Sequence, residues 1–127
     1  KLGTRLQDAG ATLPRIYCVN WFRKGPDGKF VWPGFGDNMR VLKWMLGRID
    51  GTANGVDQVF GVSPTYQDID WTGLEFSPDQ FQQVISVDVK SWRDELALHD
   101  TLFQQLAERL PGELPSVKSS IETRLVA

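Results

Sequence analysis

The sequence is poor in the residues that build most catalytic and metal sites, with one cysteine (Cys18) and one histidine (His99). A single cysteine excludes an intramolecular disulfide and is typical of a reducing compartment, so we expect a cytoplasmic protein. No apolar run is long enough to span a membrane, no secretory signal is visible, and the net charge of −2 gives no broad positive field. We therefore expect neither a membrane nor a nucleic acid as a partner.

The length of 127 residues and a composition that is 41% hydrophobic and 24% charged fit one globular domain. The first residue is Lys1 rather than Met, which indicates either processing or a piece of a longer protein. We expect a mixed α/β fold, with a strand and a hairpin in the first half and helices in the second half. We divide the single fragment, 1–127, into a strand–loop–helix segment at 13–64 and a helical scaffold at 65–127.

Periodicity, turn chemistry and capping residues predict the elements of this fold. Residues 15–22 are rich in β-branched and aromatic residues with weak alternation, which predicts a strand buried on both faces. Ser77, Pro78 and Gln80 form a capping box that predicts a helix over 78–85. The other expected elements are a short helix tail within 1–12, a turn at 23–29, a returning hairpin arm at 30–32, an irregular segment at 33–36, a helix at 38–49 capped by Asp37 or Asn38, a loop at 50–58, an extended connection at 59–74, a helix at 89–109 opened by Asp88, a break at 111–115 and a helix at 116–125.

The stretch "NWFRKGPDGKFVWPGFGDN", residues 20–38, holds five aromatic rings among four glycines, two prolines and two asparagines. A flat base needs aromatic rings above and below it, each stack contributing roughly 1–3 kcal/mol, and an amide at its edge. Glycines let the backbone approach a ligand closely, and the start of a helix offers free N–H groups. The parts of a site for a purine such as guanine are supplied by Phe22, Phe30, Phe35 and Asn38, with Gly34 and Gly36 beside them.

An aromatic-rich hairpin more often places its rings in a hydrophobic core, and that alternative stays open for residues 20–38. The placement of Phe35 argues against it, because glycines flank this residue and loops run over the surface. We expect Trp32 and Trp44 to be core residues in either case.

The remaining candidate groups have simpler structural explanations. We expect Cys18 to be a buried, inert thiol, and His99 to pack on the long helix, because one histidine without partner ligands makes a poor metal site. Paired carboxylates serve acid–base catalysis, but we expect a solvated loop for the acidic residues Asp68, Asp70 and Glu75. Basic side chains can bind phosphates. We expect instead that the side chains of Arg23, Lys24 and Lys29 point into water, because they lie on a turn.

Residues 13–51, "LPRIYCVNWFRKGPDGKFVWPGFGDNMRVLKWMLGRIDG", resemble the nucleotide-base segment of GTP-dependent phosphoenolpyruvate carboxykinase. That family carries a long pattern, N-W-F-R-x(4)-G-x-F-x-W-P-G-F-G-[ED]-N-S-R-V-L-x-W, which this segment matches densely. Beyond it, "VFGVSP" at 59–64 is a weak match, and 65–127 is similar only in layout. The resemblance implies the C-terminal part of the carboxykinase nucleotide-binding domain.

The family converts oxaloacetate and GTP to phosphoenolpyruvate, CO₂ and GDP with Mn²⁺ and Mg²⁺, as a decarboxylating lyase of gluconeogenesis. The resemblance therefore implies a guanine nucleotide, GTP or GDP, as the ligand. It implies that Phe22 and Phe35 sandwich the guanine, that Phe30 closes the pocket and that Asn38 reads the edge of the base. Trp21 lines the site in this interpretation, and Gly36 lets the backbone approach it.

The sequence departs from the family in ways that limit the expected activity. Met39 stands where the family has Ser, and the chain contains no G-x(4)-G-K-[ST] phosphate loop. The family's metal ligands and reactive cysteine belong to segments that precede the matched one. We therefore expect no catalytic residue, no metal ligand and no carboxykinase activity in the isolated chain.

Two alternatives to the carboxykinase fragment stay open. The chain could be a stand-alone, non-catalytic module that binds a nucleotide or a protein, or a purely structural piece whose rings pack on one another. The strand at 15–22 would leave an unpaired edge and an apolar face, which predicts self-association as a homodimer.

Overall fold

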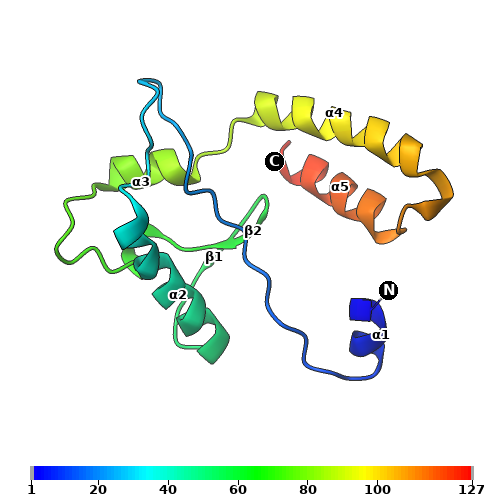
Figure 1. Ribbon diagram of the computed structural model, residues 1–127, viewed down its shortest axis with the longest axis horizontal. Coiled ribbons are helices and arrows are strands. Elements are labelled where there is room, and N and C mark those ends of the chain that lie inside the picture. The colour runs from blue at the N-terminus through cyan, green and yellow to red at the C-terminus, as the bar shows by residue number, and fades with distance from the viewer. Residues whose placement is uncertain (1, 127) are drawn as a thin grey trace.

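A computed structural model describes residues 2–126 as an elongated arrangement of helices with one small sheet (Figure 1). The mixed α/β class is confirmed in coarse form, and the second half is helical as expected. No helix in the described part of the chain has the length and apolarity to cross a membrane. The elements are α1 (Leu2–Asp8), a 3₁₀ turn at Phe35–Asp37, α2 (Asn38–Asp50), β1 (Val56–Gln58), β2 (Gly61–Ser63), a 3₁₀ turn at Tyr66–Asp68, α3 (Pro78–Ile85), α4 (Val89–Leu106), a 3₁₀ turn at Ala107–Arg109 and α5 (Glu113–Arg124).

The main core is a cluster of aromatic rings between α2, α3 and the loop that joins β2 to α3. Trp44 of α2 and Phe81 of α3 are buried there. Trp71 stacks on Phe76 with ring centroids 4.9 Å apart and on Tyr66 at 5.3 Å. Stacked and edge-on aromatic pairs contribute beyond their buried area, so a few rings provide most of the packing here.

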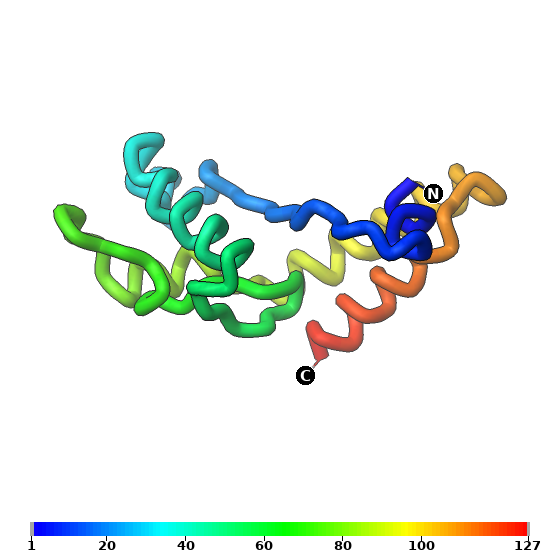
Figure 2. Tube along the Cα trace, turned by 90° about the horizontal axis from the view of Figure 1, so that it is seen from below, coloured from blue at the N-terminus to red at the C-terminus, as the bar shows by residue number. Residues whose placement is uncertain are grey.

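The helix starts follow the capping residues of the sequence. The Ser77 hydroxyl accepts a hydrogen bond from the Gln80 backbone N–H, and the Gln80 side chain accepts one from the Ser77 N–H, which confirms the predicted capping box of α3. The Asp88 carboxylate accepts from the Ser91 N–H at 2.6 Å and opens α4. Beyond α4, α5 returns beside it (Figures 1 and 2), with Leu96 of α4 buried.

The predicted strand at 15–22 is wrong. Within residues 2–126 the only strands are β1 and β2, and 15–22 has no strand beside it. The segment is tied to α2 instead, because Arg15 donates to the Arg48 carbonyl and the Tyr17 hydroxyl donates to the Met45 carbonyl. Strand propensity is expressed only where a partner strand completes the hydrogen bonding. Cys18, expected to be buried in that strand, is consequently exposed.

The small antiparallel sheet of β1 and β2 lies where a loop and an extended connection were expected. Each strand has three residues, which is too short for a visible alternation of apolar residues. The expected hairpin around 23–32 is present only as a single bridge between Lys24 and Phe30. Helix α5 begins at Glu113 rather than 116, because Pro115 falls in the first turn, where its missing N–H costs no helical hydrogen bond.

The side chain of Arg23 contacts the protein rather than water, contrary to expectation. Its guanidinium donates to the carbonyls of Val84, at 3.1 Å, and Ser86, at 2.6 Å, and to the Ser86 hydroxyl at 2.8 Å. These carbonyls lie at the end of α3, where helical partners run out. Arg23 therefore fastens the turn at 23–29 to a helix 61 to 63 residues away in sequence, whereas Lys24 and Lys29 are exposed as expected.

Two glycines around Phe35 differ in what they contribute. Gly34 has φ 153° and ψ −179°, a conformation that is almost exclusive to glycine and costs other residues about 1–3 kcal/mol. Gly36 has no positive φ, and a side chain built on it would meet nothing within 4 Å. The bend at Gly34 turns the chain into the 3₁₀ turn that carries Phe35, a short regular element that the sequence did not indicate.

Replacing Gly34 with Ala should lower the free energy of unfolding by about 1–3 kcal/mol, because alanine is strained at this φ. Gly36→Ala is the matched control and should change it by less than about 0.5 kcal/mol. Urea unfolding followed by circular dichroism measures both, and equal losses in the two variants would contradict the assignment of strain to Gly34.

Replacing Arg23 with Ala should lower the free energy of unfolding by about 1–2 kcal/mol, since three hydrogen bonds to the end of α3 are lost. Lys24→Ala removes a neighbouring cation that makes no such bonds and should have little effect. The same urea experiment checks the pair. An Arg23→Ala variant as stable as Lys24→Ala would show that the contact with α3 contributes nothing in solution.

Candidate nucleotide-base site

The five aromatic rings of residues 20–38 fall into two groups. Trp32 is 6% exposed and belongs to the core, and the half-buried Trp21 packs against it with ring centroids 5.6 Å apart. In contrast, Phe22, Phe30 and Phe35 are 72%, 57% and 91% exposed. The prediction of a core position is thus confirmed for Trp32, as it is for Trp44, while the phenylalanines lie on the surface. Exposed large apolar side chains are typical of a binding site where they lie together.

Phe35 borders a cavity of about 360 Å³ next to the start of α2. This volume is within the range that small-molecule sites occupy. Three of the predicted site residues meet in it, which are Trp21, Phe35 and Asn38. The remaining lining residues are Tyr17, Val19, Met39, Leu42 and Met45. The walls are therefore mainly apolar, with the Asn38 amide as the main polar side chain.

Phe22 and Phe30 lie outside this cavity. Their rings meet edge-on with centroids 5.9 Å apart, and the Lys24 ammonium is 5.8 Å from the centre of the Phe30 ring. Neither ring is in contact with the ring of Phe35 in the part of the chain that the structure describes. The structure thus separates the predicted site into a pocket at Phe35 and an exposed ring pair on the turn.

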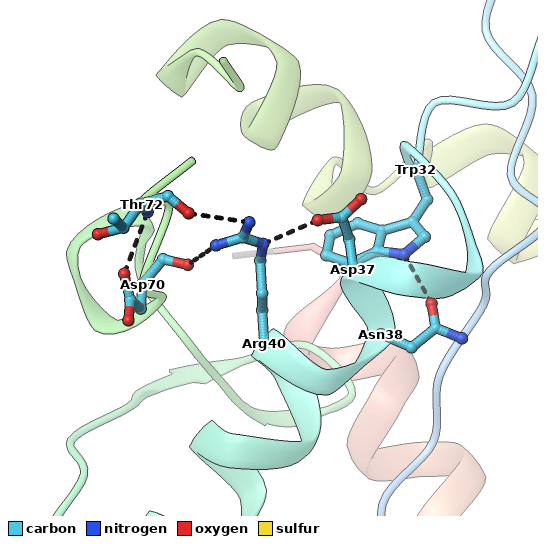
Figure 3. A network of polar contacts seen from close by, with 6 residues as sticks. All are labelled: Trp32, Asp37, Asn38, Arg40, Asp70 and Thr72. Carbon is cyan, nitrogen blue, oxygen red and sulfur yellow. Dashed lines mark hydrogen bonds and ion pairs between the residues drawn. The ribbon is translucent and has the colours of Figure 1, made fainter. Parts of the chain in front are cut away.

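Asn38 is the first residue of α2, and its side-chain oxygen accepts a hydrogen bond of 2.8 Å from the indole N–H of Trp32 (Figure 3). An indole N–H can only donate, so the amide oxygen must face it. The amino group of Asn38 then points away from Trp32, as Figure 3 shows. Sequence reasoning missed this bond, because its partners are six residues apart across an irregular loop.

The start of α2 is pinned by Arg40 (Figure 3). Its Nε pairs with the Asp37 carboxylate at 2.9 Å, and its two terminal nitrogens donate to the carbonyls of Asp70 and Thr72. Asp37 occupies the N-cap position of α2. Its carboxylate pairs with Arg40 and makes no capping hydrogen bond to the helix. The network joins the turn that carries Phe35 and Asn38 to the loop after the second 3₁₀ turn.

Of the acidic residues expected in a solvated loop, Asp70 and Glu75 are exposed and Asp68 is half-buried. Hydrogen bonds from Thr72, followed by the Lys43 ammonium, hold the pKa of Asp70 at about 2, so this carboxylate stays charged and cannot act as an acid near neutral pH. Asp68 accepts hydrogen bonds from the backbone and the hydroxyl of Thr65. His99 is half-buried and stacks on Phe103. Among residues 2–126, no three His, Cys, Asp or Glu side chains are grouped so as to hold a metal ion.

The comparisons with known proteins agree on one family. Residues 2–124 match the family described as "Phosphoenolpyruvate carboxykinase C-terminal P-loop domain". The match extends through the second half, where the sequence by itself indicated a similarity of layout only.

Three curated relatives carry the name phosphoenolpyruvate carboxykinase [GTP]. The protein from Paenarthrobacter aurescens (strain TC1) is 43% identical over 113 residues, which cover 89% of this chain and 19% of the relative. The protein from Treponema pallidum (strain Nichols) is 37% identical over 126 residues, 98% of this chain and 20% of the relative. The protein from Anaeromyxobacter dehalogenans (strain 2CP-1 / ATCC BAA-258) is 44% identical over 101 residues, 80% of this chain and 17% of the relative.

The chain thus spans about a fifth of the length of the curated relatives that it matches. The match to the family covers nearly the whole of this chain. The chain belongs to the GTP-dependent phosphoenolpyruvate carboxykinase family and corresponds to part of its C-terminal P-loop domain.

Proposed function

We propose that this chain supplies the guanine-binding part of a GTP-dependent phosphoenolpyruvate carboxykinase, an enzyme that converts oxaloacetate and GTP to phosphoenolpyruvate, CO₂ and GDP. The observation that carries the proposal is the exposed ring of Phe35 beside Asn38 in one apolar cavity at the start of α2. The relatives are named as GTP-dependent carboxykinases, which supplies the identity of the nucleotide.

Stacking is the main source of affinity in this proposal. The ring of Phe35 is almost fully in water, and covering it with a base recovers roughly 1–3 kcal/mol. Trp21 forms part of the cavity wall on the protein side. Phe22 would cover the second face of the guanine, with Phe30 beside it at the rim. Phe22 and Phe30 lie outside the cavity. The ring of Phe22 must therefore turn toward the cavity when a base binds, so that the base lies between Phe22 and Phe35.

The backbone around Phe35 leaves room for a base to come close and offers N–H donors to the edge of the base. No atom lies within 4 Å of where a side chain on Gly36 would be, so a flat ligand can come close to the main chain there. Asn38 starts α2 and its own N–H donates to the Phe35 carbonyl, while the following N–H groups of a first helical turn lack helical partners and can serve as donors. The edge of guanine presents an oxygen at position 6 that accepts such donors.

The phosphate and metal chemistry is not assigned to these residues. The sequence has no G-x(4)-G-K-[ST] phosphate loop, and the described residues show no cluster suited to a metal ion. In the whole carboxykinase, residues other than those named here would hold the phosphates and the Mn²⁺ and Mg²⁺ ions. This chain's residues bind and orient the base.

A cytoplasmic location and a homodimer stay predictions. The family comparison does not support the dimer. The surfaces that self-association would cover include Ile16, on the segment without a partner strand, and Leu98 on α4, both of which are exposed.

Titration with GDP should quench the tryptophan fluorescence of the chain, because Trp21 borders the proposed site, and ATP should quench it less. Phe35→Ala should weaken GDP binding about tenfold, which corresponds to one lost stack. Phe60→Ala is the matched control, since Phe60 is a partly exposed ring that packs at a tilt against Trp92, with ring centroids 4.1 Å apart, outside the cavity.

The control variant should bind GDP like the unchanged chain. Binding that is equally strong for GDP and ATP, or a Phe35→Ala variant that binds GDP normally, would contradict the proposed base site. Circular dichroism of each variant confirms that the helices are retained.

A further inference from the structure

We propose that Trp32 determines the base specificity of this site by holding the Asn38 amide with its amino group outward, so that the site selects purines with an oxygen at position 6. The inference rests on the proposed function, because it takes the cavity at Phe35 and Asn38 to be the base site. It adds a residue that does not touch the ligand and acts through another side chain.

The orientation of the Asn38 amide follows from a single hydrogen bond. An asparagine amide can rotate by half a turn and present either its oxygen or its amino group, and the two orientations are close in energy when nothing else intervenes. The Trp32 N–H lies 2.8 Å from Asn38 Oδ1 and has no acceptor capacity. A rotated amide would place N–H against N–H, so only the orientation with the amino group outward is allowed.

The donor itself is fixed in position. Trp32 is one of the most buried residues of the chain, and its ring packs against Trp21, Trp71 and Phe76, with centroids 5.6–6.3 Å apart. The indole therefore cannot swing away to release the amide. The backbone of Asn38 is fixed too, because its N–H bonds to the Phe35 carbonyl and the neighbouring Asp37 pairs with Arg40. What remains free is the rotation of the amide, and Trp32 removes it.

The outward amino group discriminates between purines by simple complementarity. Guanine and hypoxanthine carry an accepting oxygen at position 6, whereas adenine carries a donating amino group there. A donor on Asn38 bonds to the first two and opposes the third. Without the Trp32 hydrogen bond, the amide could turn its oxygen to adenine, and the discrimination would fall. Sites whose polar groups have one orientation reject the mismatched ligand far more strongly than adaptable ones.

The test is calorimetric titration of the 127-residue chain with GDP, IDP and ADP, comparing Trp32→Phe with Trp44→Phe. Calorimetry is used because each variant replaces a tryptophan and so changes the fluorescence signal. Trp44 is the matched control because it is equally buried and its N–H donates a bond of 2.8 Å to the Asn54 carbonyl, away from the amide of Asn38. Trp32→Phe should weaken GDP and IDP equally, by about twofold, because the freed amide is turned the wrong way about half of the time, and it should tighten ADP, so that the GDP-to-ADP ratio falls about tenfold. Trp44→Phe should leave the GDP-to-ADP ratio as it is.

A second variant keeps the test decisive if Trp32→Phe does not fold. Asn38→Asp has the same shape and keeps an oxygen for Trp32, but its outward atom becomes an acceptor. It should weaken GDP more than tenfold relative to ADP.

Four outcomes decide the matter. A GDP-to-ADP ratio unchanged in folded Trp32→Phe or in Asn38→Asp overturns the inference, as does the same drop in Trp44→Phe. A loss for GDP without a loss for IDP overturns the assignment to the oxygen at position 6. Equal binding of GDP and ADP by the unchanged chain instead sinks the proposed function itself.

Discussion

Burial of the Trp32 indole is the constraint on which the geometry of residues 20–38 depends. This stretch has little regular structure of its own, and its backbone hydrogen bonds are confined to the turn at 23–31 and the short 3₁₀ turn. A buried tryptophan removes about 150–250 Å² from water, or roughly 4–6 kcal/mol at 25 cal/mol/Å². One ring thus supplies much of the energy that holds the stretch against Trp71 and Phe76, in the loop that joins β2 to α3. Because Trp32 provides this anchor, Phe22, Phe30 and Phe35 can stay exposed without loss of the fold.

The two arms of the stretch are fixed by different kinds of contact. Arg23 holds the turn to the end of α3 through carbonyls that need an external donor, and Arg40 holds the start of α2 through the carbonyls of a loop. Both arginines act on main-chain oxygens, for which the planar guanidinium with its several donors is better suited than a lysine ammonium. The arginine contacts therefore fix the two ends of residues 20–38, the turn at 23–29 and the start of α2. The buried Trp32 fixes the chain between those two ends. The cavity at Phe35 lies beside α2, whose residues Asn38, Met39 and Leu42 line it.

The sequence predicted the elements that residues close in sequence determine, such as capped helices. It failed for the features that depend on contacts between residues distant in sequence. Helices α2, α3 and α4 were predicted well because periodicity and caps such as Ser77 and Asp88 act within a few residues. The strand at 15–22 was wrong because strand formation requires a neighbour, and no pattern reveals its absence. The contact of Arg23 with α3 and the bond between Trp32 and Asn38 were missed because both join residues through the folded structure. The placement of Phe35 and Asn38 in one cavity, in contrast, follows from a loop that runs directly into a helix, whereas Trp21 reaches the same cavity only through the fold.

The separation of Phe22 from the cavity indicates how the proposed base slot would close. Arg23 follows Phe22 directly and is bonded to α3, so the backbone at Phe22 stays in place and its ring can reach the base only by a change of side-chain rotamer. Phe35 is 91% exposed, so its side chain meets few neighbours and can change rotamer at small cost. In the proposed site, the rings of Phe22 and Phe35 thus turn onto the base, while the Asn38 amide, fixed by Trp32, keeps its orientation. Affinity and specificity would then reside in different residues, with Phe35 supplying the stacking energy and Asn38 the selection of the base.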